Sequence, residues 1–430
     1  MNKKMLVKGN KTSGLAGATL GFFIGFAAVS LFGPTVNHLK SVVGLNAALA
    51  GLLISIPNLS GSLLRIPFAA WVDKDGGRKP LLVLLVLSIA GVSGIYLVMI
   101  QSDVMIARLF PLLLFFGILG GCGVATFSVG IGQTSYWYPR SQQGSALGAY
   151  AGLGNLAPGL FTLLLTNLTL PLFGLSTSYL LWVVFLVLGT SAYWFLGRNA
   201  PYFQFRAAGV NETESRELSA KAGQELFPKE SARESLKHSA GIPETWLLVS
   251  VYFTTFGGFL ALTGWLPLYS TNYLGFSLAS AGILTAGYSM GASLMRVIGG
   301  KISDHIGGVT TAAAALLIAF SGAAITALAS NIGLSVTGII LLAIGMGVGN
   351  AAVFKLVPQA VPDAVGGAAG WVGGLGAFGG FVIPILLAFF LNDTEGHDKG
   401  YAHGFWVFAA LFLVSLATLF YIKKQIQSRT

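Results

Sequence analysis

Residues 62–73 read Ser-Leu-Leu-Arg-Ile-Pro-Phe-Ala-Ala-Trp-Val-Asp, and residues 293–304 read Ser-Leu-Met-Arg-Val-Ile-Gly-Gly-Lys-Ile-Ser-Asp. Each stretch holds an arginine, Arg65 or Arg296, within an apolar run, and an aspartate, Asp73 or Asp304, follows eight residues later. The two arginines are 231 positions apart, so the shared motif indicates an internal repeat. Buried cations are costly in a bilayer and are usually kept for function, so one in each half predicts a shared anion site.

The composition is that of a membrane protein. Hydrophobic residues make up 54% of the 430 positions and charged residues only 9%. About 20 apolar residues cross a bilayer as a helix. Runs of this length are predicted at 14–34, 46–70, 81–101, 109–136, 145–168, 177–197, 245–269, 278–300, 309–329, 333–360, 365–391 and 403–422. The period-two alternation of a barrel is absent, so the chain is predicted to be an all-α membrane protein with twelve transmembrane helices.

The net charge of +10 follows the predicted topology. With the N-terminus in the cytoplasm, nineteen of the 25 Lys and Arg fall in cytoplasmic segments, and only Lys40, Arg108 and Lys399 fall on the far side. This positive-inside bias predicts a multi-pass protein of the cytoplasmic membrane with both termini inside. The basic balance therefore indicates no nucleic-acid partner. No P-loop, metal cluster or catalytic group of nucleophile and base is visible, so we expect no enzyme activity, cofactor or metal.

Two six-helix bundles are predicted, at 1–197 and 244–430. The polar segment 198–243 separates them as a cytoplasmic linker, in which 211–238 is either a surface helix or a solvated stretch. A second repeat supports this division, because Gly-x-x-x-Gly-Leu-Gly occurs at Gly148, Gly152 and Gly154 and again at Gly370, Gly374 and Gly376. The offsets of 231 and 222 both map one helix onto the helix six places later. These glycines permit close helix approach, either as sliding surfaces or as static packing.

The loop at 70–80, Ala-Trp-Val-Asp-Lys-Asp-Gly-Gly-Arg-Lys-Pro, resembles the cytoplasmic loop signature of the major facilitator superfamily, and 300–307 is a reduced copy. Within that superfamily the chain resembles the NarK-type nitrate/nitrite porters. The resemblance rests on 64–68, 143–155, 255–259, 349–355 and the glycine-rich run 366–381. It implies a two-bundle secondary transporter that moves nitrate and nitrite by alternating access.

The resemblance also implies a binding site. The two anion-clamping arginines of the family map onto Arg65 and Arg296, and aromatic residues at the places of Tyr252, Phe256 and Phe127 border the anion. Asn155 completes the expected substrate-binding set. Four groups of the cytoplasmic loops are expected to control conformation: Asp73, Arg78, Lys79 and Asp304. The chain departs from the family at Tyr150, where an asparagine is frequent, and this leaves the preference between nitrate and nitrite open.

The depth of the arginines agrees with this interpretation. Eight helical residues cover about 12 Å, and half of a bilayer core of ~30 Å is about 15 Å, so both side chains are expected near the midplane. A guanidinium offers paired planar donors that match a flat oxyanion. The alternative is that backbone carbonyls satisfy both groups. Anion binding is preferred because no acid is expected in the membrane to pair with them.

The carboxylates constrain the mechanism. All fifteen Asp and Glu and the five His are expected in loops or at helix ends, so no buried proton relay is predicted. An empty site with two unpaired cations resists reorientation, and a bound monoanion lowers that penalty. Nitrate/nitrite antiport by a monomer is therefore the preferred hypothesis. The alternatives are a proton-coupled nitrate symporter, a carrier of another small organic anion, and a transporter-like membrane anion sensor.

Overall fold

The computed structural model describes residues 7–228, 232–361, 364–391 and 399–427, and every regular element in these ranges is a helix. Residues up to 197 form α1 (Lys11–Phe26), η1 (Ala27–Ser30), η2 (Gly33–Thr35), α2 (Val36–Val43), α3 (Ala47–Leu63), α4 (Arg65–Asp75), α5 (Arg78–Met99), α6 (Asp103–Arg108), α7 (Phe110–Gly121), η3 (Cys122–Ala125), α8 (Thr126–Trp137), α9 (Arg140–Gly154), α10 (Ala157–Leu164), η4 (Leu165–Thr169) and α11 (Leu170–Leu196).

The linker and the C-terminal half follow. The linker contains α12 (Pro201–Ala207), α13 (Glu212–Lys221) and α14 (Ala232–Ala240), so the predicted surface helix is two separate helices. The C-terminal half comprises α15 (Pro243–Tyr252), η5 (Phe253–Gly257), α16 (Gly258–Asn272), α17 (Leu278–Ile306), α18 (Gly308–Leu328), α19 (Ile332–Ala360), α20 (Val365–Leu375), α21 (Gly379–Ala388), α22 (Gly400–His403) and α23 (Phe405–Gln427).

Within the described ranges, ten segments are long and apolar enough to cross a membrane. One of them, Ser141–Leu196, is 56 residues long and turns at Gly174, whose φ of +75° is a conformation that L side chains rarely adopt. This segment contains the predicted span at 145–168 and all but the last residue of that at 177–197. The predicted span at 278–300 lies in α17, which is 29 residues long but is not among the ten. The helical membrane fold is therefore confirmed, while the count of twelve stays a prediction.

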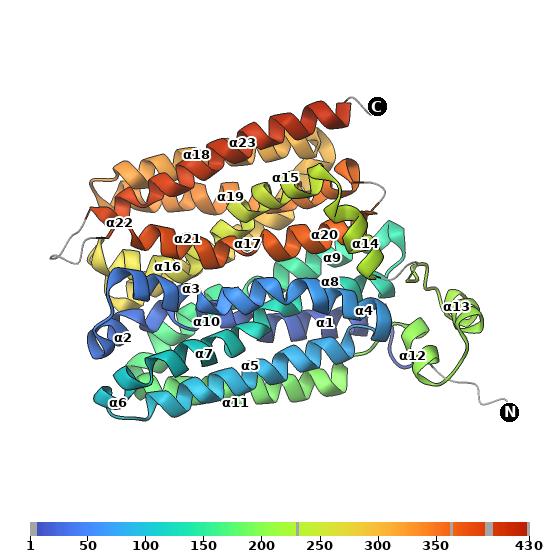
Figure 1. Cartoon of the computed structure of the whole chain (residues 1–430), viewed down its shortest axis with the longest axis horizontal. Coiled ribbons are helices and arrows are strands. Elements are labelled where there is room, and N and C mark those ends of the chain that lie inside the picture. The colour runs from blue at the N-terminus through green and yellow to red at the C-terminus, as the bar shows by residue number, and fades with distance from the viewer. Residues whose placement is uncertain (1–6, 229–231, 362–363, 392–398, 428–430) are drawn as a thin grey trace.

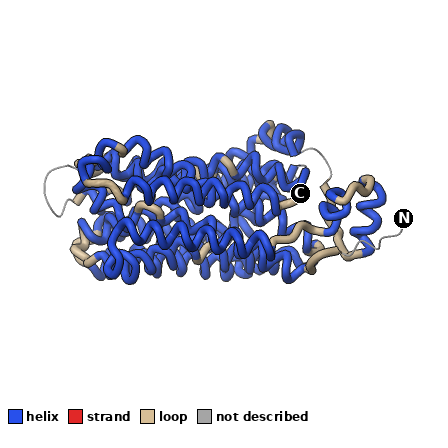
Figure 2. Tube along the Cα trace, turned by 90° about the horizontal axis from the view of Figure 1, so that it is seen from below, coloured by secondary structure: helices blue, strands red, loops and turns tan. Residues whose placement is uncertain are grey.

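The two halves lie against each other along their length. In Figure 1 the N-terminal half forms the lower layer and the C-terminal half the upper layer, with α3 against α21 and α10 against α17. The linker helices α12 and α13 lie beyond the end of the long helices at which α1 begins and α23 ends. Figure 2 shows the elongated helical body in a second view, with short helices set apart at that end.

The two halves are in contact at one end of the long helices, and a cavity lies between them at the other end. Far from α12 and α13, Asn37 Nδ2 donates to Thr271 Oγ1 across the two halves at 2.7 Å. Gly33 also approaches Gly264 so closely that a Cβ at Gly33 would lie 2.5 Å from the Gly264 carbonyl oxygen. At the linker end, a cavity of about 220 Å³ lies between α4 and α8 of one half and α14, α19 and α20. The buried interior is therefore accessible from the linker end.

Candidate functional site

Arg65 lies at the break between α3 and α4 and is completely buried. Its guanidinium donates only to backbone carbonyls: Nε to Gly61 at 3.2 Å, Nη1 to Gly373 at 3.1 Å and Nη2 to Val124 at 3.4 Å. These acceptors belong to α3, which precedes Arg65 directly, to α20 of the other half and to η3. Arg65 is thus held in place from three sides, which keeps its positive charge at the junction of the halves.

Arg296 lies in the middle of α17 and is held less firmly. Nη2 donates to the hydroxyl of Tyr252 at 3.2 Å, and Nη1 is a buried atom without a hydrogen-bond partner. A buried N–H without an acceptor is costly, and a charged one more so. The two guanidinium groups are therefore unequal, because Arg65 has carbonyl acceptors on three nitrogens and Arg296 keeps one nitrogen free to take an acceptor.

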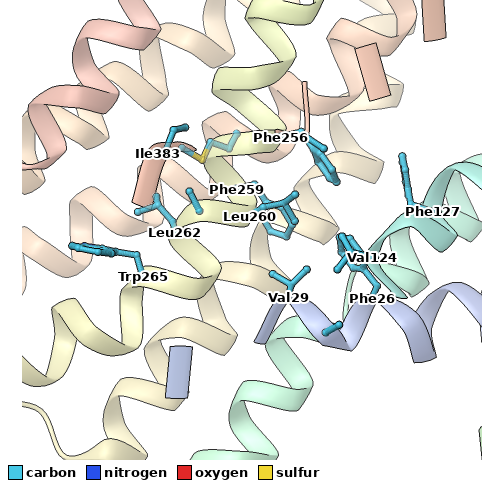
Figure 3. Close-up of a cluster of buried hydrophobic side chains, with 14 of the residues drawn as sticks. Phe26, Val29, Val124, Phe127, Phe256, Phe259, Leu260, Leu262, Trp265 and Ile383 are labelled. Atoms are coloured by element: carbon cyan, nitrogen blue, oxygen red, sulfur yellow. The ribbon is translucent and has the colours of Figure 1, made fainter. Parts of the chain in front are cut away.

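Two stacked phenylalanines connect the arginines. Phe127 and Phe256 come from different halves, and their ring centroids are 5.6 Å apart (Figure 3). Arg65 Cζ lies 4.8 Å from the Phe127 centroid and 5.0 Å from that of Phe256, and Arg296 Cζ lies 5.4 Å from both. The two Cζ atoms are therefore at most about 10 Å apart. Aromatic faces attract cations by about 0.5–2 kcal/mol, so the rings favour the charge of the buried Arg65 and that of the partly buried Arg296.

Tyr252 and Phe354 complete the aromatic wall. The Tyr252 ring stacks on Phe256 at 5.0 Å and meets Phe354 edge-on at 4.9 Å. Its hydroxyl accepts from Arg296, so the hydroxyl proton is free to be donated to a ligand. Phe354 was not singled out as a site residue from the sequence, yet its ring lies 5.9 Å from Arg296 Cζ. Phe354 lies 227 positions after Phe127, and this offset falls between the offsets of 222 and 231 in the internal repeat. The repeat could therefore have identified Phe354 from the sequence.

The charge of the site is uncompensated by carboxylates. Among the described residues, neither Arg65 nor Arg296 forms an ion pair with an Asp or Glu. Two unit charges at most 10 Å apart repel by roughly 1.7 kcal/mol or more at an effective dielectric constant of about 20. A monoanion between them would remove this repulsion and supply the acceptor that Arg296 Nη1 lacks. The arrangement is therefore suited to binding one small anion.

Asn155 is buried beside this wall, in contact with α17. Its backbone carbonyl accepts from Ser293 Oγ at 3.0 Å, and its side-chain Oδ1 has no partner. No hydrogen bond joins it to either guanidinium in the described part of the chain. The neighbouring Tyr150 is fully buried, and its hydroxyl lies 2.8 Å from the carbonyl oxygen of Phe127.

The predicted glycines differ in their surroundings. A Cβ at Gly148 would meet nothing within 4 Å, whereas one at Gly154 would lie 1.9 Å from Phe22. A Cβ at Gly152 would lie 2.9 Å from Val297, and one at Gly374 would lie 2.6 Å from Ile66. Gly376 allows contact with Tyr252, and Gly370 faces Leu236 of α14. Three of the six, Gly152, Gly374 and Gly376, therefore permit contacts between the two halves or with the site.

Asp73 and Asp304 lie near the ends of α4 and α17, and each is hydrogen-bonded to a neighbouring helix. Asp73 Oδ1 accepts from the hydroxyl of Tyr136 in α8 at 2.7 Å. Asp304 accepts from Lys355 Nζ of α19 at 2.7 Å, and this ammonium group also donates to the carbonyl of Ser303. The hydrogen bond and the charge of Lys355 lower the pKa of Asp304.

The basic loop residues bind within the N-terminal half. Arg78 Nη2 donates to the carbonyl of Trp194 at 2.7 Å, and its backbone N–H donates to the side chain of Asn199. Lys79 lies 3.8 Å from Asp75, one turn earlier along the chain, and is largely exposed. These contacts fix the loop to α11 and to the residues that follow it.

The cavity at the linker end leads to the arginine pair. It is lined by Phe127 and Phe354, whose rings contact the guanidinium groups, and by Gly373, whose carbonyl accepts from Arg65. Asp73 and two residues of α14, Ser235 and Leu236, line the same cavity. A small solute that reaches the arginines from the linker end would therefore pass a carboxylate and a linker helix.

Comparison with known proteins agrees with this architecture. The model of the Major Facilitator Superfamily matches residues 18–384 and 271–429. Among solved structures, the xylose transporter XylE from E. coli in a partially occluded inward-open conformation superimposes with a TM-score of 0.72 at 16% identity, covering 96% of this chain and 97% of that one. The chain therefore belongs to the Major Facilitator Superfamily, and it is a multi-pass membrane transporter and not an enzyme.

Three relatives with similar sequences are all named as transporters of nitrate or nitrite. The chain is 30% identical to the probable nitrate/nitrite transporter NarK2 of Mycobacterium tuberculosis, over 91% of both chains. It is 29% identical to the probable nitrate/nitrite antiporter NarK1 of Thermus thermophilus, over 86% of this chain and 83% of that one. It is 26% identical to the nitrite extrusion protein of Bacillus subtilis, over 96% and 94%. The resemblance to the NarK-type family is thereby confirmed.

Proposed function

We propose that this protein exchanges nitrate and nitrite across the cytoplasmic membrane and that Arg65 and Arg296 bind the transported anion between them. The observation that carries the proposal is the pair of guanidinium groups on one stack of phenylalanines, with no carboxylate partner among the described residues. The names of the relatives agree with this substrate class.

A planar oxyanion suits the donors of this site. Arg296 Nη1 lacks an acceptor, and the Tyr252 hydroxyl has a proton to donate. The rings of Phe127 and Phe256 provide a dry surface that a weakly hydrated anion tolerates better than a strongly hydrated one. Arg65 contributes charge, since its nitrogens already bind carbonyls. Asn155 would join the site only after a change in its contacts.

Transport requires the site to open at alternate ends. The bundles 1–197 and 244–430 each carry one arginine, so a rocking motion of one against the other would expose the anion to each side in turn. We propose that the linker end, with α12 and α13, faces the cytoplasm, because the positive-inside bias places the linker and both termini there. The loop groups Asp73, Arg78, Lys79 and Asp304 would then hold the cytoplasmic ends of the helices.

Exchange follows from the charge of the site. An empty site holds two like charges in a dry environment, and closing it around them is unfavourable. A bound monoanion lowers this cost, so the loaded protein reorients more readily than the empty one. After nitrate has been carried across and released, the site would thus return only when nitrite, or another nitrate, binds to it on that side.

One observation favours a second candidate, the proton-coupled nitrate symporter. Asp73 lines the cavity that leads to the arginines, and its carboxylate is held by Tyr136. A carboxylate on the anion path is a plausible place for a proton that travels with nitrate. Replacement of Asp73 by Asn separates the two mechanisms, because an exchanger does not need this proton.

Counterflow in proteoliposomes tests the proposed function. Vesicles loaded with unlabelled nitrite should take up isotopically labelled nitrate, with uptake lost when the lumen holds no permeant anion. Acidification of the lumen during uptake into empty vesicles would establish symport instead. Anion binding without any flux would identify the protein as a sensor.

A further inference from the structure

Tyr150 is a buried tyrosine next to the anion site, and its hydroxyl is hydrogen-bonded to backbone carbonyls and to neither guanidinium in the described part of the chain. Its ring packs against Phe22 at 5.0 Å and Phe127 at 6.3 Å. Its hydroxyl lies 2.8 Å from the carbonyl oxygen of Phe127 and 3.2 Å from that of Thr126. The hydroxyl fits because α8 has a glycine opposite it, where a Cβ at Gly130 would lie 2.2 Å from the phenolic oxygen.

These contacts meet at the one phenylalanine of the N-terminal half whose ring lies against both arginines. Phe127 is the second residue of α8 and follows the short helix η3 directly. A hydroxyl bound to the Phe127 carbonyl therefore sets how far this ring reaches towards Arg65 and Arg296.

Resting on the proposed function, we infer that Tyr150 is a positioning residue that sets the anion affinity of the site through Phe127. The test is Tyr150→Phe, which keeps the ring and removes the hydroxyl. Tyr179→Phe is the matched control, because Tyr179 is equally buried and its hydroxyl is bound to the carbonyl of Leu31 and the hydroxyl of Thr35, neither of which contacts the guanidinium groups or Phe127 in any interaction described above.

The expected result is a several-fold rise in the half-saturating nitrate concentration for Tyr150→Phe, with an unchanged maximal exchange rate and with Tyr179→Phe equal to the unsubstituted protein. A mere structural role would lower thermal stability in both variants and leave the affinity of the folded protein unchanged. That pattern, or unaltered nitrate affinity in Tyr150→Phe, overturns the inference. If the unsubstituted protein exchanges no nitrate, the proposed function itself has failed.

A separate observation concerns the linker helix α14, which lies in a groove of glycines on α20. Ser235 Oγ accepts from the backbone N–H of Gly367 at 3.0 Å, and Trp371 Nε1 donates to the carbonyl of Leu236 at 3.0 Å. A Cβ at Gly367 would lie 2.2 Å from the Ser235 carbonyl oxygen, so only glycine permits this approach.

The position of α14 has a consequence for the anion path. It contacts α4 of the N-terminal half as well as α20 and α15 of the C-terminal half. Ser235 and Leu236 line the same cavity as Phe127 and Phe354. A helix bound to one half and touching the other at the mouth of this cavity must change its contacts when the mouth opens.

We propose that α14 is a lid that limits access from the linker end to the anion site. Neighbouring glycines give a matched test, because a Cβ at Gly366 would lie 3.8 Å from Ser235 Oγ, an ordinary contact. Gly367→Ala should therefore displace α14, while Gly366→Ala leaves it bound with the same change in helix propensity.

Access is read out with a single cysteine at Ser128, a cavity residue, after the one native cysteine is replaced by Cys122→Ala. Gly367→Ala should raise the rate of labelling by a polar thiol reagent several-fold, and Gly366→Ala should not. Trp371→Phe, which removes the donor to Leu236 and keeps most of the ring, should act in the same direction if Gly367→Ala fails to fold. Equal labelling rates in all folded variants would show that α14 does not limit access. The labelling assay does not depend on which anion the protein transports.

Discussion

The unequal contacts of the two arginines predict unequal effects of Arg→Lys substitution. In Arg296→Lys a single ammonium group replaces two guanidinium nitrogens, one bound to Tyr252 and one without a partner. The anion thereby loses one charge-assisted hydrogen bond, worth about 1.5–3 kcal/mol. This corresponds to anion binding weakened by about 10- to 150-fold. The stability of the empty protein should change little, because no protein acceptor other than Tyr252 loses its donor.

Arg65→Lys should also destabilise the protein. Three carbonyl oxygens, those of Gly61, Val124 and Gly373, accept from this guanidinium, and lysine cannot reach all of them in the same geometry. Two buried acceptors left unsatisfied cost about 1–3 kcal/mol each. Thermal unfolding in detergent and nitrate titration by calorimetry, made on the same samples, separate the two effects.

Nitrate binding by Arg296→Lys as tight as that of the unsubstituted protein would contradict this division of roles. The division is contradicted equally if Arg65→Lys leaves the unfolding temperature unchanged while Arg296→Lys lowers it. Either outcome would mean that the hydrogen bonds described here do not divide the roles of the two side chains.

Three further predictions follow from neighbouring contacts. Gly154→Ala should lower stability by about 1–3 kcal/mol through overpacking against the buried Phe22, while Gly148→Ala, with open space around its Cβ, should not; thermal unfolding of the two variants decides this. Asp304 has a lowered pKa, so its bond to Lys355 persists above the ordinary value near 3.9 and is lost only as pH falls through the lower folded-state value. The difference in exchange rate between the protein and Asp304→Asn should accordingly be constant from about pH 5 to pH 8, and a change within that range contradicts the assignment. Asp73→Asn should retain nitrate/nitrite counterflow, whereas proton uptake with nitrate that is present in the unsubstituted protein and absent from Asp73→Asn would favour the proton-coupled alternative.

The helical membrane fold could be predicted because apolar runs and buried arginines are local features of the sequence. The repeated phrase around Arg65 and Arg296 also predicted that the two side chains face one interior, since related helices of a repeat occupy related places. The family resemblance added the aromatic partners Tyr252, Phe256 and Phe127. These three rings surround the guanidinium groups in the structure.

The remaining features depend on contacts between distant segments. The carbonyl of Gly373 on Arg65 and the groove for α14 arise from backbone atoms, whose positions no side-chain pattern reveals. The ion pair of Lys355 in α19 with Asp304 in α17 likewise joins two helices that are distant in the sequence. The turn at Gly174, by contrast, falls in the gap between the predicted spans 145–168 and 177–197.

Nitrate titration of the purified protein tests most directly whether two guanidinium groups share one ion. We predict one nitrate per chain, with binding abolished by Arg65→Gln and by Arg296→Gln alone. Binding of two nitrates per chain, or of one nitrate with unchanged affinity in either variant, would contradict the account.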